Sequence, residues 1–503
     1  MEKSFSFSKE KLIIKLENLC MNEDINDNKF PALRLSSFCF FSTFWALGHI
    51  FHLTKYSKWQ ETPLSLSVIF FSFFLLLKTG SLGRLLIVSF LQVLHCLYVL
   101  PVSANHWFFA MIINLYILFS WFFISVRKRE FFFYSNRFYL NIRSGLIFLL
   151  FCLYFITGFH KLNFDFFDIQ KSCSVIFSRV YRYDDGFFGE YLNYVPVVLT
   201  LLLELGICFL LFIRRLSFFA VISFLCFHLY IGYTGIFDFS TLCFAILFSL
   251  YSPHIILTLK KVIPAVNLLA KNNSFFGFLY SYKFIAFVLM LFLWPVLGKD
   301  FFSVLWFIGV VSFFSVVFWH KGDVGIFKLK SIRFRFSRLN KIIVCFFFLI
   351  IAANGLSPYF GLKTITTFSM FSNLRIGLGW GSNHLVFKDY IYKLSDDADD
   401  WVEIIDSNDS RLSVFGENKL RVAYLDFVDY LQQRVLEEKK LQFRSFVLAE
   451  TPISVNYIRN GVEYRVDDVL ESKEIMKPIP WWKRKFISFR HLVPKNHVGN
   501  CQW

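Results

Sequence analysis

Residues 195–252 read VPVVLTLLLELGICFLLFIRRLSFFAVISFLCFHLYIGYTGIFDFSTLCFAILFSLYS. This stretch divides into three apolar runs, 195–213, 216–232 and 236–252, and the Arg214–Arg215 pair separates the first two. A helix needs about 20 apolar residues to cross the hydrocarbon layer of a bilayer. The three runs therefore predict three consecutive membrane-spanning helices.

Composition extends this prediction to most of the chain. Of the 503 residues, 56% are hydrophobic and 21% aromatic, and phenylalanine alone accounts for 70. A soluble domain is typically about 45–50% apolar. The formal net charge is +17, yet the tail from Leu356 to Trp503 carries 20 basic and 19 acidic residues. The basic surplus therefore lies between apolar runs, where it indicates membrane topology and argues against nucleic-acid binding.

Eleven runs are predicted to span the membrane: 36–54, 64–78, 85–102, 107–126, 145–160, 195–213, 216–232, 236–252, 282–298, 301–319 and 341–355. Basic clusters fall in alternate connections, such as Arg127–Lys128–Arg129, Arg214–Arg215 and Lys260–Lys261. Because cytoplasmic loops carry the excess of Lys and Arg, this pattern predicts a cytoplasmic N-terminus and an extracytoplasmic tail. We expect a multi-pass protein of the cell (inner) membrane that contacts membrane lipids.

The expected fold class is an all-α polytopic membrane bundle of about 11 helices with a small C-terminal α+β extramembrane domain. Its regions are a cytoplasmic N-terminal segment (1–35), a transmembrane domain (36–355) and an extracytoplasmic domain (356–503). In the tail, apolar positions at helical spacing predict a helix over 421–440, and segments 443–448 and 453–458 are predicted as strands. Cys173 in an outer loop and Cys501 in the tail could pair if the compartment is oxidising.

Polar side chains at membrane depth are candidate functional groups, because burying them in lipid is costly. With this topology, the outer halves of four helices carry Asn105, His106, His160, Lys161, Glu204 and His228. This placement alone predicts a shared outer site. Simpler interpretations remain open: Lys161 could snorkel to the interface, His106 could anchor a helix end, and Glu204 could hydrogen-bond a neighbouring helix.

A metal site is a further alternative, because His49, His52 and His95 also fall toward the outer side. Neither a histidine pair four residues apart nor an H-E-x-x-H run accompanies them. No metal is therefore expected.

Four local patterns occur in order along the chain. They are Asn105–His106 before an aromatic-rich helix, Gly158–Phe159–His160–Lys161–Leu162–Asn163–Phe164–Asp165, Leu203–Glu204–Leu205 with Phe209–Leu210–Leu211–Phe212, and Phe227–His228 with Gly235–Ile236–Phe237. Together they resemble the membrane domain shared by vitamin K-dependent γ-glutamyl carboxylases and their bacterial relatives, the horizontally transferred transmembrane domain (HTTM) proteins. A further stretch, 358–363 with 368–374 and Asn383–His384, resembles the bacterial relatives but is also typical of an interfacial amphipathic segment.

The resemblance implies a quinol-dependent carboxylase. Lys161 would act as an unprotonated amine that takes a proton from vitamin K hydroquinone (reduced menaquinone), and burial in an apolar pocket makes such an amine available. O2 and CO2 would be the co-substrates, and a peptide or protein glutamate would be carboxylated. The expected catalytic residues are Lys161, His106, Asn105 and His228, and His160 and Glu204 are expected to bind the cofactor.

Departures from the family pattern leave a second class of function open. Phe166 or Phe167 stands where the family has a tryptophan, and the extracytoplasmic region is much smaller than in the animal enzymes. The alternative is a non-catalytic HTTM-type membrane scaffold, lipid-binding protein or peptide-maturation factor. A quinone-sized polar cavity that reaches Lys161, His106 and His228 would favour the enzyme.

Overall fold

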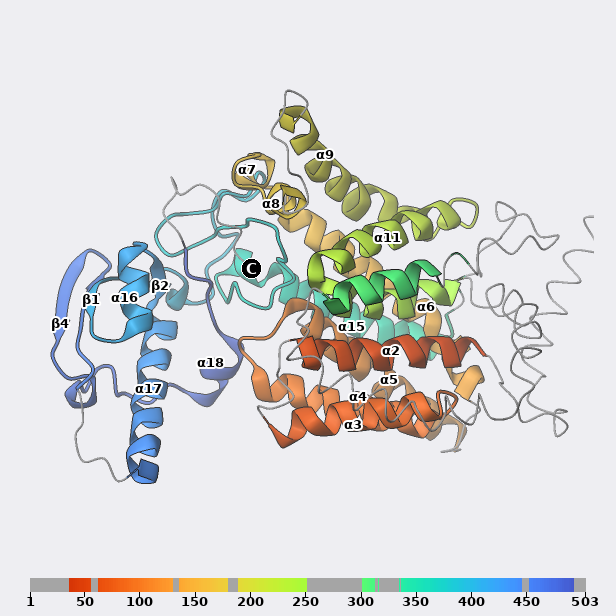
Figure 1. Cartoon of the computed structure of the whole chain (residues 1–503), viewed down its shortest axis with the longest axis horizontal. Helices are drawn as coiled ribbons and strands as arrows, with labels where there is room; N and C mark the ends of the chain where they lie inside the picture. The colour runs from red at the N-terminus through yellow and green to blue at the C-terminus, as the bar shows by residue number, and fades with distance from the viewer. Residues whose placement is uncertain are drawn as a thin grey trace, which may run out of the picture. The chain divides into compact units, whose positions relative to one another are not determined.

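The computed structural model is mostly helical, with a small antiparallel sheet near the C-terminus (Figure 1). It describes residues 36–55, 62–129, 135–179, 189–250, 301–312, 315, 334, 336–445 and 452–492. These residues fall into two compact units that interleave along the sequence. Unit 1 comprises the described residues within Met1–His95, Ala110–Phe151 and Phe209–Phe347, and unit 2 comprises those within Cys96–Phe109, Cys152–Cys208 and Phe348–Trp503.

The membrane region contains α2 (Ser37–Lys55), α3 (Pro63–Leu77), α4 (Leu82–Val99), α5 (Asn105–Lys128), α6 (Ser135–His160), α7 (Phe164–Phe167), α8 (Cys173–Arg179), α9 (Gly189–Leu201), the π-helix η2 (Leu202–Ile207), α10 (Cys208–Leu210), α11 (Ser217–Ile231), the π-helix η3 (Gly232–Ile236), α12 (Phe237–Leu247), the 3-10 helix η4 (Phe248–Leu250) and α15 (Arg338–Leu356). The tail contains η6 (Ser357–Phe360), η7 (Asp396–Ala398), β1 (Trp401–Ser407), α16 (Ser410–Glu417), β2 (Arg421–Ala423), α17 (Tyr424–Ser445), β3 (Val455–Arg459), β4 (Val462–Val466), η8 (Val469–Glu471) and α18 (Trp481–Phe486).

Six of the described helical segments are long and apolar enough to cross a membrane: Leu82–Val99, Asn105–Lys128, Ser135–His160, Leu192–Leu210, Ser217–Leu247 and Arg338–Phe360. Pro63–Leu77 and Phe301–Ser312 are shorter apolar helices. These segments identify the chain as a multi-pass membrane protein. The predicted run 282–298 lies outside the described residues, and 301–319 is described only in part, so the number of eleven spans stays a prediction.

Unit 1 contains buried side chains that hydrogen-bond from one helix to another. Asn114 on α5 accepts a bond from the Trp45 indole (2.9 Å) and donates to Gln92 (2.8 Å) and to His49 Nε2 (3.2 Å). His49 Nδ1 lies 2.6 Å from the Trp45 carbonyl, and because a carbonyl only accepts, Nδ1 carries the proton and Nε2 accepts. Each such bond between helices in lipid contributes roughly 0.5–2 kcal/mol.

A break at Gly235 separates α11 from α12 in unit 1. Its φ of +99° lies in the left-handed region, which glycine adopts without a steric penalty. The predicted runs 216–232 and 236–252 therefore correspond to two helices that meet at this glycine.

The tail of unit 2 folds as a four-stranded antiparallel sheet in the order β2-β1-β3-β4. Val402 and Tyr457 of the sheet share a buried core with Phe427 and Leu431 of α17. The helix predicted over 421–440 is confirmed as α17 from Tyr424 onward, but residues 421–423 form β2, where Val422 pairs with Val402 of β1. The strand predicted over 453–458 is confirmed as β3.

The strand predicted over 443–448 is wrong at residues 443–445, which complete α17. The preceding segment, 437–442, reads EEKKLQ and consists of strong helix formers, so the helix continues through it. Residues 446–448 lie outside the described residues.

Candidate functional site

Lys161 and Glu204 form a buried ion pair within unit 2. Lys161 directly follows α6, Glu204 lies in η2, and Lys161 Nζ donates to Glu204 Oε2 over 2.6 Å. The two side chains are only 5% and 7% exposed. Because desolvating two charges is costly, a buried pair among apolar helices is a candidate functional centre.

The chain around this pair allows a close approach of α6 and η2. A Cβ atom on Gly158 would lie 2.8 Å from Leu205 Cγ and 2.9 Å from Glu204 Cβ, so no side chain fits at position 158 without a shift of its neighbours. The π-helix η2 contributes as well, since π-helical turns are frequent at functional sites. Gly158 thus allows α6 and η2 to lie close together beside the Lys161–Glu204 pair.

Two other predicted site residues of unit 2 bond to the segment that follows α15. The Tyr359 hydroxyl donates to His160 Nδ1 over 2.9 Å, and His160 Nε2 donates to the Thr367 carbonyl over 3.2 Å. Asn105 Oδ1 accepts a 2.6 Å bond from the backbone N–H of Phe368. His160 and Asn105 therefore hold residues 359–368 in place, which gives both a structural role.

Polar side chains also fix the stretch after Lys161. Asn163 Oδ1 accepts from the backbone N–H of Phe166 over 2.9 Å and so caps α7. Asp165 Oδ2 forms a 2.6 Å ion pair with Arg375 Nε and accepts a 2.8 Å bond from Asn383 Nδ2. The two contacts of Asp165 join the segment after α6 to the tail.

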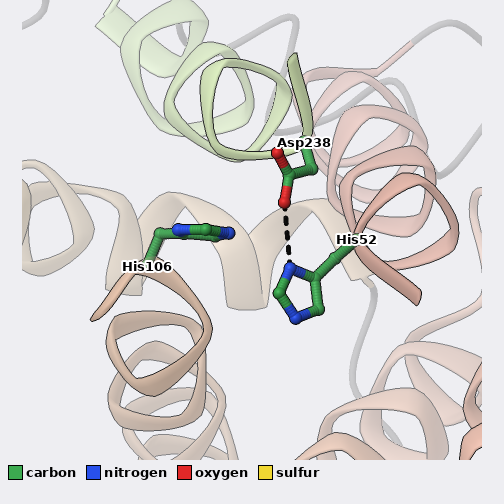
Figure 2. A group of neighbouring side chains, drawn as sticks. All are labelled: His52, His106 and Asp238. Atoms are coloured by element: carbon green, nitrogen blue, oxygen red, sulfur yellow. Dashed lines mark hydrogen bonds and ion pairs between the residues drawn. The ribbon is translucent and has the colours of Figure 1, made fainter. Parts of the chain in front are cut away.

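Unit 1 contains a second buried ionic cluster, which sequence analysis missed. His52 Nδ1 donates to Asp238 Oδ2 over 2.9 Å, and Lys55 Nζ lies 3.3 Å from Asp238 Oδ1. Figure 2 shows the His52 ring directed at the Asp238 carboxylate; the third labelled residue, His106, belongs to unit 2. Imidazole and carboxylate are ligands that divalent metals accept, but Lys55 already places a cation on this carboxylate. The missed signal was an acid inside the apolar run 236–252.

The two remaining predicted site residues are buried histidines. His106 lies in the first turn of α5, in unit 2. His228 lies on α11 of unit 1 and contacts three aromatic rings at centroid distances of 5.6, 5.2 and 6.2 Å, those of Phe227, Phe239 and Phe244. The prediction that both histidines share one chamber with Lys161 stays a prediction.

Two further cationic side chains of unit 2 lie outside the spans. Lys363 Nζ lies 5.2 Å from the centroid of the Phe108 ring, and burial lowers the pKa of Lys363 to about 8. Burial likewise lowers the pKa of Arg490 to about 10, and its Nη2 lies 3.3 Å from Ser369 Oγ. An amine with a pKa near 8 is partly unprotonated at neutral pH, which makes Lys363 a second candidate base. In the sequence, Lys363 is notable only as part of the 358–363 stretch.

Cys173, at the start of α8, is disulfide-bonded. Cys501 lies outside the described residues, so its pairing with Cys173 stays a prediction.

Comparisons with protein-family models, with curated proteins and with solved structures find no match to this chain. The resemblance to the carboxylase family therefore stays an expectation from the sequence, and the function is argued from the residues of the site.

Proposed function

We propose that this chain is a multi-pass membrane enzyme in which Lys161 and Glu204 act together as an acid–base pair on a lipid-soluble substrate. The proposal rests on the 2.6 Å contact between two ionisable side chains that are almost completely buried. Ionisable residues at membrane depth are rare and mark substrate pathways or proton relays. A pair that can exchange a proton is suited to such a role.

The contact provides a destination for the proton of Lys161. Transfer from the ammonium to the Glu204 carboxylate converts the ion pair into a neutral amine and a neutral acid, which need less solvation in an apolar surrounding. The freed amine of Lys161 can then accept a proton from a bound hydroxyl group, as a general base. Glu204 thus acts through Lys161, a more specific role than cofactor binding.

The carboxylase resemblance supports a quinol as the substrate class: vitamin K hydroquinone (reduced menaquinone), with O2 and CO2 as co-substrates and a peptide or protein glutamate as acceptor. A quinol hydroxyl requires a base and an apolar, aromatic surrounding. Lys161 supplies the base, and Phe159 and Tyr359 supply rings whose centroids lie 5.7 Å apart. Bound quinol would supply the oxidisable ring. A site enclosed by lipid and protein suits this chemistry, because water would quench a strong base.

The test is quinol oxidation in membranes that contain the Lys161→Ala variant. We expect loss of quinol epoxidation in Lys161→Ala and a strong reduction in Glu204→Gln, with activity compared per amount of folded protein because both changes also lower stability. The matched control is Lys171→Ala, because Lys171 also lies in unit 2 but is more exposed and forms longer ion pairs, with Asp165 (3.9 Å) and Asp168 (3.5 Å). If Lys161→Ala still epoxidises quinol, Lys161 is not the base. If the unaltered protein does not epoxidise quinol, the proposed enzymatic function is wrong.

A specific observation favours the second candidate, a non-catalytic membrane scaffold. Asn105 and His160 both bond to residues 359–368, as a purely structural motif would. On this alternative, Asn105→Ala and His160→Ala lower the stability of the protein, and Lys161→Ala affects stability alone. Measuring quinol oxidation and thermal stability on the same variants separates the two functions.

The proposed topology has eleven spans in the cell (inner) membrane, a cytoplasmic N-terminus and an extracytoplasmic tail. The six candidate spans and the disulfide at Cys173 support it. Reporter fusions after residues 128 and 445 should report the cytoplasm and the outer compartment, respectively. The opposite result at residue 445 would reverse the orientation and contradict an outward-facing site.

A further inference from the structure

Helix α18 carries an exposed aromatic patch on unit 2. Trp481, Trp482 and Phe486 are 69%, 52% and 45% exposed. The rings of Trp481 and Phe486 pack edge to face with centroids 6.0 Å apart, so they belong to one surface. Exposed aromatic groups of this size mark contacts with a partner or a membrane.

Lys485 ties α18 to the end of a membrane span. Its Nζ donates to the carbonyls of Tyr98 (2.8 Å) and Leu100 (3.2 Å), at the C-terminal end of α4. A helix leaves its last carbonyls unpaired, and a cation at this end also complements the helix dipole. Because α4 is a candidate span that ends at Val99, these bonds place Lys485 of α18 at the end of that candidate span.

The surface beside α18 is the kind that lipid covers. Leu97, Tyr98 and Val102, at and just after the end of α4, are all exposed. Lys485 Nζ lies 5.7 Å from the Tyr98 ring, so α18 contacts this same side of the span. The aromatic patch therefore continues an exposed apolar face at the end of this candidate span.

The other cations of α18 are bonded within the tail. Lys483 pairs with Asp397 at 2.7 Å, and Arg484 Nη2 donates to Gln432 Oε1 over 2.6 Å. These contacts fix the helix to the tail and engage its positive charges. The exposed surface of α18 is therefore chiefly aromatic, so binding to a bilayer does not require anionic headgroups.

We propose that Trp481, Trp482 and Phe486 insert into the interfacial layer of the phospholipid bilayer and anchor the extramembrane tail on its surface. Indole rings favour this layer, because one edge is apolar and the N–H can remain hydrated. The partner is the headgroup–acyl boundary of a phospholipid bilayer. The proposal is independent of the acid–base function.

The test uses the full-length protein in phosphatidylcholine nanodiscs whose acyl chains carry bromine, which quenches nearby tryptophan. In ordinary lipid, Trp481→Phe/Trp482→Phe should lower the tryptophan emission. In lipid brominated near the headgroup, the same substitution should lower it much less, because both indoles are already quenched. The matched control is Trp401→Phe on β1, where the loss of emission should be similar in both lipids.

An equal loss in both lipids for the double variant would place the two indoles in water and overturn the proposal in favour of a protein partner. Bromine near the chain ends should quench less than bromine near the headgroup, and the reverse order would contradict an interfacial position. The single variant Trp482→Phe gives the same readout with a smaller change to the fold.

Discussion

Lys161 Nζ and Glu204 Oε2 lie 2.6 Å apart, although 43 positions and three helices separate the two residues in the chain. Each supplies the opposite charge that the other needs in a buried surrounding. The stability of unit 2 and the proposed proton transfer therefore depend on the same contact.

Removing one partner of this pair should destabilise the protein strongly. Lys161→Met or Glu204→Leu alone is expected to cost about 3–5 kcal/mol, because an uncompensated buried group remains. The double variant Lys161→Met/Glu204→Leu should cost clearly less than the sum of the single changes. Thermal unfolding in nanodiscs measures each term of this double-mutant cycle.

The comparison variant is Lys171→Met. The ion pair of Lys171 with Asp168 is partly exposed, and such pairs contribute about 0–1 kcal/mol. If the costs of Lys161→Met and Glu204→Leu simply add, the two side chains do not interact and the pair carries neither stability nor function.

A methyl group at Gly158 should separate α6 from η2. The added Cβ would meet Leu205 and Glu204 within 3 Å, and overpacking of this kind costs about 1–3 kcal/mol. Gly158→Ala should also reduce quinol oxidation, because the change displaces Glu204 from Lys161. In contrast, Gly83→Ala in α4 meets no atom within 4 Å and should be neutral or stabilising by up to about 1 kcal/mol. Equal effects of the two substitutions on the melting temperature would contradict the close approach.

Asn383 should be required for the order of the segment that joins α6 to the tail. Its amide donates to Asp165 (2.8 Å) and to the Asn373 carbonyl (2.9 Å), and its oxygen accepts from the Arg375 backbone N–H (2.8 Å). Asn383→Ala leaves these groups without their bonds, at a cost of about 1–3 kcal/mol. Hydrogen exchange over 366–388 should rise sharply, and unchanged protection there would contradict the prediction. Asn418→Ala, which loses one exposed bond, serves as the control.

Asp426 should make the tail less stable as the pH rises. Burial raises the pKa of this carboxyl from 3.8 to about 7, while the Ser488 hydroxyl (2.6 Å) and the Phe489 N–H (2.8 Å) donate to it. The folded state therefore binds a proton more tightly than the unfolded state, so stability falls as the pH rises from about 4 to about 7 and levels off above that.

The variant Asp426→Asn resembles the protonated carboxyl and should flatten this profile. Melting of the purified protein, followed by circular dichroism across this pH range, measures the change. Asp467→Asn is the control, because that carboxylate is largely exposed and pairs with Arg465 at the surface. If the melting temperature of Asp426→Asn still falls as the pH rises, another group causes the pH dependence.

Local pattern was sufficient to predict the helical membrane region and much of the tail. Continuous apolar runs predicted the bounds of α4, α5 and α15 to within two or three residues; α5, for example, begins at Asn105, two residues before the predicted run. The run 145–160 marked only the apolar part of α6, which begins at Ser135. Its first turns contain Asn136 and Arg137, and such polar residues at the end of a span are not visible in a hydropathy run.

The site was harder to predict, because its contacts join residues that are distant in the chain. A lysine and a glutamate in neighbouring spans could be identified individually, since each is costly in lipid. Their pairing requires α6 and η2 to approach closely at Gly158, and neither hydropathy nor spacing encodes that approach. Asp238 was missed because its partner His52 lies 186 residues away, and one acid does not interrupt an apolar run.

The interleaving of the two units has a consequence for biosynthesis. Unit 2 is assembled from Cys96–Phe109, Cys152–Cys208 and the chain after Phe348, so its first two segments leave the ribosome long before the third. Until then, Asp165 lacks its ion pair with Arg375 and its bond from Asn383, and the segment after α6 is not joined to the tail. A nascent chain truncated before residue 375 should therefore be a substrate for membrane chaperones and quality-control proteases.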